Sequence, residues 1–434
     1  MNTRHRYNLS GDTMYQGLSS DTKPTENVPQ NAIYTELDTG DQYFFDEEWV
    51  KMATPEEKQA DLLSIMVRDQ LLTTPNWGDI QKIVRQGLAK DVFEIGDQIA
   101  TTYMNGDTEL ECLFDVVHFG KVYDQDGKEH DGMFLQAHHA MPLGVQFSNY
   151  QAFYYAKDGL SAGTYNIKWG NGWGTHVVNG KSYQFTLTQA VPAGGQLSGF
   201  YGAPDQAPTN WKVYSWESNS AVTPIETVSV TEGTGGTNLG TISSNTKTET
   251  LNAMQSVAYG YNRWNQSAVE QYLNSEGDNW WVPKSNFDRR PDQYNQKGFL
   301  TGFNSDFLEV LQPVKVLTSA NTIIDGGVTD ITYDKFFLPS LEQIYVVPQA
   351  DGVEGEYWEY WKQRTGATAP QAQYGTYPER ITYAIENHSS AQNVRLRSAY
   401  RGNSFNTWFV YSSGTVNYGH AIYANRFAPA CVIY

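Results

Sequence analysis

Cysteine and long hydrophobic runs are nearly absent from this chain of 434 residues. Cys112 and Cys431 are its two cysteines, too few for a disulfide framework or a cysteine-based metal site, and we expect two buried free thiols. No run of about 18 apolar residues occurs, so we expect no membrane span. The N-terminal residues also lack the apolar stretch of a secretory signal.

Positive charge is scarce as well, because 30 Lys and Arg face 48 Asp and Glu, a net charge of −18. Nucleic acids and anionic membranes are bound through basic patches, so we expect neither as a main partner. Aromatic residues, in contrast, make up 14% of the chain. This composition is more typical of extracellular binding or virion proteins than of cytosolic enzymes. Without a secretory signal, such a protein is expected to leave the cell by lysis, as part of a phage particle.

The C-terminal stretch 387–434 contains no Asp, Glu or Lys. Its charged residues are Arg395, Arg397, Arg401 and Arg426. Its aromatic residues are spaced by Ser, Asn, Thr and Gly, and they are Tyr400, Phe405, Trp408, Phe409, Tyr411, Tyr418, Tyr423 and Phe427. Tyr and Trp give large contact areas at low cost in rotamer entropy, and Ser, Gly and Asn give adaptable hydrogen bonds, as in antibody loops. The stretch therefore predicts a binding surface.

Alternation within this stretch predicts how its side chains divide between two faces. A strand over 408–411 would place Trp408 and Val410 on one face and Phe409 and Tyr411 on the other. If the Trp408 face is buried, Phe409 and Tyr411 stand exposed beside the loop 418–423 and form a patch for a ligand. In the alternative, both faces of the strand are buried inside the domain.

Composition and periodicity predict an α+β chain with few helices, organised in four segments. The segments are a small and partly flexible N-terminal attachment module at 1–75, a first domain part at 76–141, a β-rich insertion at 142–250 and a C-terminal part at 251–434. Within the module we expect a β-hairpin at 32–46 and a helix at 55–72, and the next segment opens with a helix near 77–87.

Several segments share a pattern with one known fold. They are 394–398, 406–410, 413–416 and 426–430, together with the 77–87 helix followed by 93–97, and 337–342 followed by 357–361. In combination they resemble the formylglycine-generating-enzyme type of C-type lectin fold, as found in phage and gut-bacterial proteins. The resemblance covers about half of the chain, around 76–140 and 251–434. It implies one lectin-like domain interrupted by the insertion.

The C-terminal region also resembles the variable region of proteins diversified by retroelements, in which template adenines are mutagenised. The resemblance implies a variable region at about 395–434 with fixed framework residues, namely Trp408, Val410, Gly414, Val416, Ala421, Ala424, Phe427 and Pro429. The residues between them that are reachable from an AAC-type codon include the implied ligand-binding set of Phe405, Phe409, Tyr411, Asn417, Tyr418, His420, Ile422 and Tyr423.

Catalytic and metal chemistry find little support in the residues. Formylglycine-generating enzymes use a close cysteine pair and a metal, which Cys112 and Cys431 do not reproduce, so the resemblance implies the fold without that chemistry. His138 and His139 are adjacent and lack a metal-ligand spacing. Acidic pairs such as Glu354 and Glu356 are better explained as solvated turn residues than as glycosidase carboxylates. We expect no enzyme activity, catalytic residue, metal or cofactor.

These observations lead to three functional hypotheses. In the first, a phage receptor-binding protein or adhesin presents the diversified surface to a bacterial cell-surface receptor, either protein or glycan. It acts as a homotrimer on the virion, docked to tail or particle proteins through residues 1–75, or alternatively on a bacterial cell surface. In the second, an enzyme on the same fold acts on surface glycan or protein, with a buried titratable cluster in a cleft away from 405–423. In the third, the patch is an assembly interface of a structural virion protein.

Overall fold

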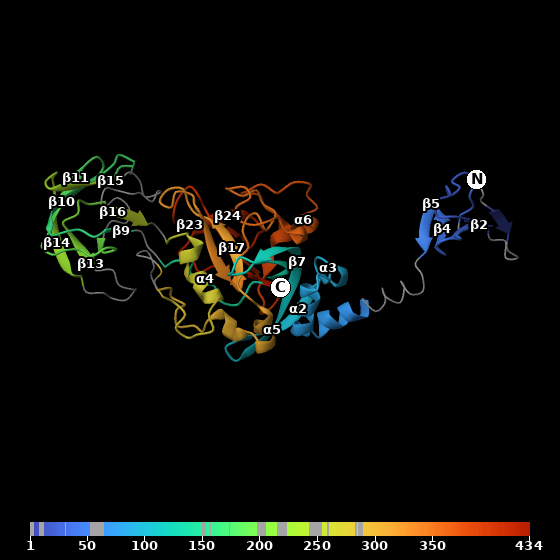
Figure 1. The fold of residues 1–434 in the computed structure, drawn as a ribbon. Coiled ribbons are helices and arrows are strands. Elements are labelled where there is room, and N and C mark those ends of the chain that lie inside the picture. The colour runs from blue at the N-terminus through green and yellow to red at the C-terminus, as the bar shows by residue number, and fades with distance from the viewer. Residues whose placement is uncertain are drawn as a thin grey trace. The chain divides into compact units, whose positions relative to one another are not determined.

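The structure is a computed structural model that describes residues 4–7, 13–30, 32–52, 65–149, 153–156, 158–172, 174–197, 205–214, 224–242, 254–257, 260–282, 284 and 290–434. The chain forms two compact units, Met1–Gln70 and Leu71–Tyr434, and each is described by itself (Figure 1). Strands dominate and helices are few and short, in agreement with a mixed α+β class. Within the described ranges, no helix is long and apolar enough to cross a membrane.

The first unit is a five-stranded sheet in the order β1-β2-β3-β4-β5. Its strands are β1 (Arg4–Tyr7), β2 (Thr13–Gly17), β3 (Ile33–Glu36), β4 (Gln42–Asp46) and β5 (Glu48–Met52). The pairing of β3 with β4 confirms the hairpin predicted at 32–46. β1 and β2 lie in a segment where no regular element was expected. Buried Tyr34 packs edge-on against Trp49, with ring centroids 5.6 Å apart, and gives this unit an aromatic core.

Three helical segments precede the main sheet of the second unit in the sequence. Residues 65–73 are helical, while 53–64 of the helix predicted at 55–72 lie outside the described residues. α2 (Trp77–Arg85) confirms the helix predicted near 77–87, and the side chain of Asn76 caps it by accepting from the backbone N–H of Asp79 at 3.1 Å. The short α3 (Ala89–Val92) follows.

The main sheet of the second unit brings together distant parts of the sequence. Its order is β19-β25-β8-β7-β6, in which all neighbours are antiparallel. The strands are β6 (Gln98–Asn105), β7 (Thr108–Tyr123), β8 (Glu129–Ala137), β19 (Phe336–Phe337) and β25 (Ala430–Ile433). Cys112 and Cys431 lie on β7 and β25 as buried free thiols, as expected. The C-terminal strand is therefore part of the same core as residues 98–137.

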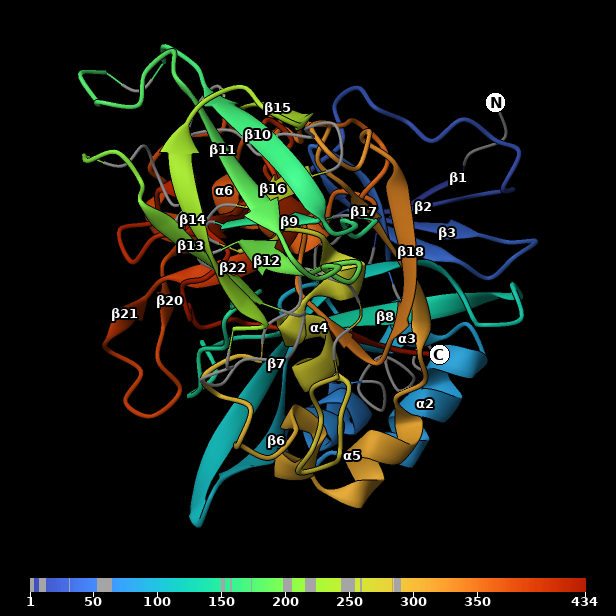
Figure 2. The ribbon, with the colours of Figure 1, turned by 90° about the vertical axis from the view of Figure 1, so that its left-hand side faces the viewer.

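The segment expected to be a β-rich insertion, 142–250, supplies seven strands of an eight-stranded sheet in the order β15-β10-β11-β14-β13-β12-β9-β16 (Figure 2). The eighth strand, β16, lies beyond the expected boundary at 250. The strands of this sheet are β9 (Phe153–Ala156), β10 (Gly163–Trp169), β11 (Ser182–Leu187), β12 (Gln196–Leu197), β13 (Asn210–Tyr214), β14 (Glu226–Glu232), β15 (Thr237–Ile242) and β16 (Met254–Val257). The sheet has a hydrophobic core of its own around Trp169, Tyr183 and Trp211.

The remaining elements lie between residues 264 and 420 of the sequence. They are η1 (Trp264–Gln266), α4 (Ala268–Leu273), η2 (Phe299–Gly302), α5 (Ser305–Val310), the hairpin of β17 (Val314–Ser319) and β18 (Thr329–Asp334), α6 (Glu359–Thr365), η3 (Pro378–Arg380), the pair β20 (Thr382–Tyr383) and β21 (Ala391–Gln392), and the sheet of β22 (Val394–Ala399), β23 (Asn406–Val410) and β24 (Val416–His420). The last sheet carries four of the eight residues expected to bind a ligand, namely Phe409, Asn417, Tyr418 and His420, and the other four lie in the adjoining loops.

Candidate binding surface

The register of the sheet β22-β23-β24 decides which aromatic side chains share a face. Trp408 on β23 pairs with Tyr418 on β24, and Phe409 pairs with Asn417. Directly paired residues project to the same side of a sheet. Tyr418 therefore lies on the Trp408 face, and the expected grouping of Tyr418 with Phe409 and Tyr411 is wrong.

Three tyrosines gather around Trp408 and form what we call the tyrosine cluster, made of Tyr374, Tyr400 and Tyr418. The ring of Tyr418 lies 4.1 Å from that of Tyr400 and 6.0 Å from that of Tyr374, measured between centroids. Trp408 is fully buried beneath them, and its indole N–H donates to Gln349 at 3.1 Å. Tyr374 is 52% exposed, so the cluster presents aromatic surface to solvent over a fixed floor.

Tyr374 reaches the cluster because residues 374–377 run alongside β24. The N–H of Tyr374 donates to Val416 O at 2.9 Å, and the N–H of Val416 donates to Gly375 O at 2.9 Å. Gly414 lies in the turn before β24 with a φ of +81°, a conformation that favours glycine. A Cβ at this position would also clash with the carbonyl oxygen of Tyr377. Neither Tyr374 nor Tyr400 was among the expected ligand-binding residues. Residues 374–377 have the same Tyr-, Gly- and Thr-rich composition as the predicted binding surface, which could have pointed to Tyr374, but they lie outside the expected variable region.

The hydroxyl of Tyr374 remains protonated over the whole physiological range. Partial burial, followed by the neighbouring Tyr400 and Tyr418, raises the pKa of Tyr374 to about 12. A protonated phenol is both a donor and an acceptor of hydrogen bonds. The cluster therefore combines ring faces with a neutral hydroxyl, and it offers no formal charge of its own.

The opposite face of the sheet is less open than predicted. Phe409 is buried, with its ring against Gly419 and the Arg395 guanidinium 5.8 Å from its centroid. The exposure expected for Phe409 is therefore wrong, and both faces of β23 are buried there. Tyr411, half-buried, packs against Phe409 with ring centroids 4.4 Å apart. Asn417 on the same face is also half-buried.

The other expected ligand-binding residues lie at the end of β24. Tyr423 is 55% exposed and stacks on His420, with ring centroids 5.2 Å apart. Burial, and then the positive charge of Arg395, lowers the pKa of His420. Phe405 is buried beside His420, and Ile422 is half-buried. This corner thus offers mainly Tyr423 to a ligand.

Most of the expected framework residues are buried. Trp408, Val410, Gly414, Val416, Ala421, Phe427 and Pro429 are buried, while Ala424 is exposed. Ala424 lies on the turn after Tyr423, and the role of all eight as fixed framework residues stays a prediction.

Arg395 holds the loop after β24 through main-chain atoms. Its buried guanidinium donates to the carbonyls of His420 at 3.2 Å and Tyr423 at 2.7 Å, and also to the hydroxyl of Thr407. Burial lowers the pKa of Arg395 to about 9. Carbonyl oxygens are present whatever the side chain, so these bonds fix the loop backbone without specifying its side chains.

Asn262 holds the loop between β22 and β23 in the same way. Its fully buried side-chain amide donates to the carbonyls of Tyr400 (3.1 Å), Asn403 (2.9 Å) and Asn406 (2.7 Å). Its own oxygen accepts from Asn321 Nδ2 at 3.0 Å. The loop that carries Tyr400 and Phe405 is therefore also fixed by acceptors that any residue supplies.

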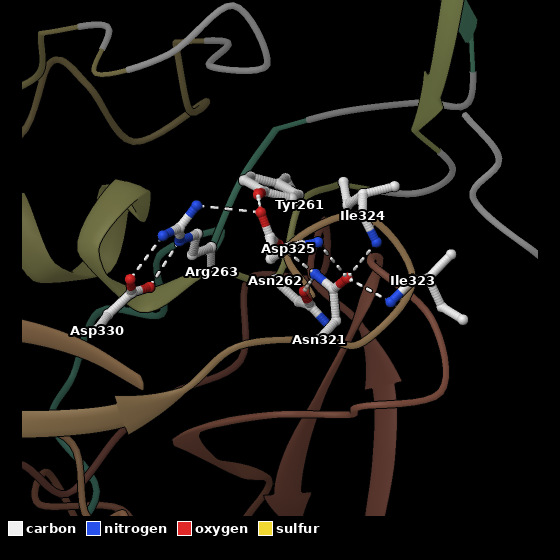
Figure 3. Close-up of polar contacts among 8 residues, drawn as sticks. All are labelled: Tyr261, Asn262, Arg263, Asn321, Ile323, Ile324, Asp325 and Asp330. Atoms are coloured by element: carbon white, nitrogen blue, oxygen red, sulfur yellow. Dashed lines mark hydrogen bonds and ion pairs between the residues drawn. The ribbon is translucent and has the colours of Figure 1, made fainter. Parts of the chain in front are cut away.

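Asn262 is joined through Asn321 to a network of polar side chains (Figure 3). Asn321 Oδ1 accepts from the N–H groups of Ile323 and Ile324 at 3.2 and 3.0 Å, which shapes the loop after β17. Arg263 donates to both carboxylate oxygens of Asp330 at 2.6 Å and to Asp325 at 3.1 Å. Tyr261 also donates to Asp325. Every group drawn has a partner within the chain, so the network is a support and offers no open ligand position.

A separate cleft of about 110 Å³ contains the titratable cluster that an enzyme hypothesis requires. The buried carboxylate of Asp115 lies 2.8 Å from His138 Nδ1 and 2.9 Å from Gln98 Nε2. Burial, and then Asp115, raises the pKa of Tyr360 far above its usual range. Neither Ser nor Cys lines this cleft. The hydroxyl of Thr382, which does line it, donates to the carbonyl of Arg380 at 3.4 Å and not to the Asp115–His138 pair. In the part of the chain that the structure describes, no group of three His, Cys, Asp or Glu residues is placed to hold a metal ion.

One family model matches part of the chain. Residues 241–434 match a domain of unknown function (DUF6273), and this segment includes the tyrosine cluster, Asn262 and Arg395. No curated protein and no solved structure matches the chain. The description of this family gives no activity, so the geometry of the surface is the basis for a proposed function.

Proposed function

We propose that this chain is a receptor-binding protein or adhesin of a phage, and that its C-terminal lectin-like domain binds a bacterial cell-surface protein or glycan. The observation that carries the proposal is the tyrosine cluster, half-exposed over buried Trp408. An exposed aromatic group on a rigid support gives contact area without a large loss of entropy on binding. The surrounding stretch 387–434 has no acidic residue, although the chain is strongly acidic.

Diversification by a retroelement is part of this proposal. Arg395 and Asn262 hold the two loops through carbonyl oxygens, so side chains between the framework positions can change without loss of these bonds. A half-exposed position such as Tyr411, Tyr418 or Tyr423 would then vary at little cost in stability. Buried Phe405 and Phe409 would tolerate fewer replacements.

Affinity would come largely from multivalency. Polar, wet aromatic paratopes usually bind single sites with moderate strength. A homotrimer, present in several copies on a virion and docked through the Met1–Gln70 unit, would supply the remaining avidity.

The proposal is tested by capture from two sources with the immobilised full chain, namely solubilised bacterial envelopes and disrupted virions. We expect an envelope protein or glycan to be retained, with Tyr374→Ala weakening its retention. Retention of virion components alone would favour the assembly-interface hypothesis and contradict receptor binding. The flanking DNA tests diversification separately, through an imperfect, adenine-rich copy of codons 395–434 near a reverse transcriptase gene. If both are absent, diversification is wrong, and receptor binding is still decided by the capture experiment.

A further inference from the structure

A pocket away from the tyrosine cluster lies between β7, β8 and β17. It has a volume of about 170 Å³. Its apolar walls are formed by Val122, Phe134, Val314, Val316, Phe337 and Trp358. Phe134 and Trp358 face each other with ring centroids 6.1 Å apart, at an angle of 52° between the ring planes. No residue of the tyrosine cluster lines it.

The volume of the pocket limits what it can hold. An apolar cavity of about 150 Å³ is large enough to bind benzene. The pocket therefore has room for one six-membered ring with a short substituent, and its aromatic walls favour an aromatic ring, which packs on Phe134 and Trp358 in tilted geometry.

The mouth of the pocket adds positive charge to these walls. Lys315 on β17 is exposed and lies 5.8 Å from the ring centroid of Tyr123, without an ion pair to any described residue. Lys121, also at the mouth, pairs with Asp131 at 2.8 Å. Two carboxylates line the pocket, Glu354 and Glu356.

Both of these carboxylates already have partners. Glu354 accepts from Ser398 Oγ at 2.6 Å and from the N–H of Ser319 at 3.1 Å, and Glu356 pairs with His118 Nε2 at 3.2 Å. The other ring nitrogen of His118, Nδ1, is buried and has no hydrogen-bond partner among the described residues. Arg397 and Tyr123 also line the pocket, but Arg397 donates to the carbonyls of Leu317 and Leu338, and Tyr123 donates to Glu129. Lys315 and His118 Nδ1 have no such partner among the described residues and are available to a ligand.

We propose that this pocket binds a small aromatic monocarboxylate, with its ring packed against the contacting pair of Phe134 and Trp358 and its carboxylate directed to Lys315. The apolar walls contribute through burial of the ring, and the amine contributes through a partly exposed ion pair. This site does not rest on the proposed receptor-binding function and shares no residue with the tyrosine cluster.

The test uses three probes on the full-length protein, measured by calorimetry or ligand-observed NMR. Phenylacetate combines ring and charge, benzyl alcohol has the ring without the charge, and acetate has the charge without the ring. We expect saturable binding of phenylacetate, weaker binding of benzyl alcohol and no saturable binding of acetate. Absence of saturable phenylacetate binding at millimolar concentration would overturn the proposal.

Two substitutions locate the binding site. Lys315→Gln should weaken phenylacetate binding by about two- to fivefold, as expected for a partly exposed ion pair, and leave benzyl alcohol unchanged. Lys362→Gln, at an exposed lysine outside the pocket, is the matched control and should change neither. Val316→Phe should fill the pocket and abolish binding of both ring probes. Because Val316 is buried, a melting curve must first show that this variant is folded; if it is not, Lys315→Gln decides. Unchanged phenylacetate binding by Lys315→Gln would contradict the proposed site.

Discussion

At the scale of single residues, the sheet β22-β23-β24 and its loops separate into buried side chains that form the floor and side chains that are partly exposed to solvent. Trp408 is fully buried and hydrogen-bonded to Gln349, whereas Tyr418 is half-buried and Tyr411 lies at the edge of the sheet. A side chain with buried contacts contributes to folding, and one with exposed area is available for binding.

Alanine substitution should separate these two roles. Trp408→Ala should lower the free energy of unfolding by about 3–5 kcal/mol, because it leaves a large cavity. Tyr411→Ala and Tyr418→Ala should cost about 1 kcal/mol each, typical of partly exposed positions. Denaturant unfolding measures all three, and equal losses would contradict the division into floor and surface.

His139 gives the fold a specific dependence on pH. Its ring is buried and stacks on His388 with centroids 4.1 Å apart. Burial, and then the positive charges of His138 and His388, lowers the pKa of His139 to about 4 from an ordinary 6.5, against the opposing effect of Asp115. The unfolded chain therefore binds more protons than the folded chain between these two pH values.

The contribution of neutral His139 to the free energy of unfolding should be fully present above pH 6.5 and should be lost as the pH falls toward 4. The loss amounts to at most about 3 kcal/mol. Melting curves from pH 7 to pH 4 should show a shallower decline for His139→Gln than for the natural chain. Parallel slopes for the natural chain and His139→Gln would exclude this assignment.

At the scale of elements, the loops of the surface are held by their backbones. Arg395 bonds to the carbonyls of the loop after β24, and Asn262 bonds to those of the loop between β22 and β23. Residues 374–377 add a further partner to β24. The backbone of these loops is thus held by hydrogen bonds that do not depend on the exposed side chains.

Arg395→Lys should loosen the loop after β24, because a lysine lacks the planar fork that reaches several carbonyls. We expect a loss of about 1–3 kcal/mol, together with faster amide hydrogen exchange in 419–425. Arg426→Lys is the matched control, because Arg426 is partly exposed and pairs with Glu386 at 2.7 Å. Its expected loss is below about 1 kcal/mol, and equal effects of the two substitutions would contradict a holding role for Arg395.

The sequence predicted the elements of this surface better than their register. Alternation grouped Trp408 with Val410 correctly, since side chains of a strand alternate between its two faces, but burial of Phe409 on the other face does not follow from period two. It could not place Tyr418, because a one-residue change in pairing moves a side chain to the other face, and the pairing is set by the turn. Tyr374 was missed because its contact with Tyr418 depends on long-range pairing between 374–377 and β24.

At the scale of the whole molecule, the chain has two units with separate cores. The Met1–Gln70 unit is built around Tyr34 and Trp49, and the Leu71–Tyr434 unit has its own clusters of buried residues. Independent cores allow separate folding. A chain shortened to 71–434 should therefore melt at nearly the temperature of the same unit in the full chain and retain its ligand, as measured by calorimetry and capture. A collapse of the melting transition on removal of 1–70 would show that the units depend on each other.

The central claim, that the tyrosine cluster binds a bacterial surface, is tested most directly by flow cytometry. The natural chain and the double variant Tyr374→Ala/Tyr418→Ala are each labelled and added to a panel of bacterial cells. Tyr383→Ala is the control, because Tyr383 is 41% exposed on β20 and does not belong to the cluster. We predict that the double variant remains folded and loses at least about tenfold in cell binding, consistent with the loss of central aromatic contacts, while the control binds as the natural chain does. Binding of the folded double variant at the natural level would contradict the claim.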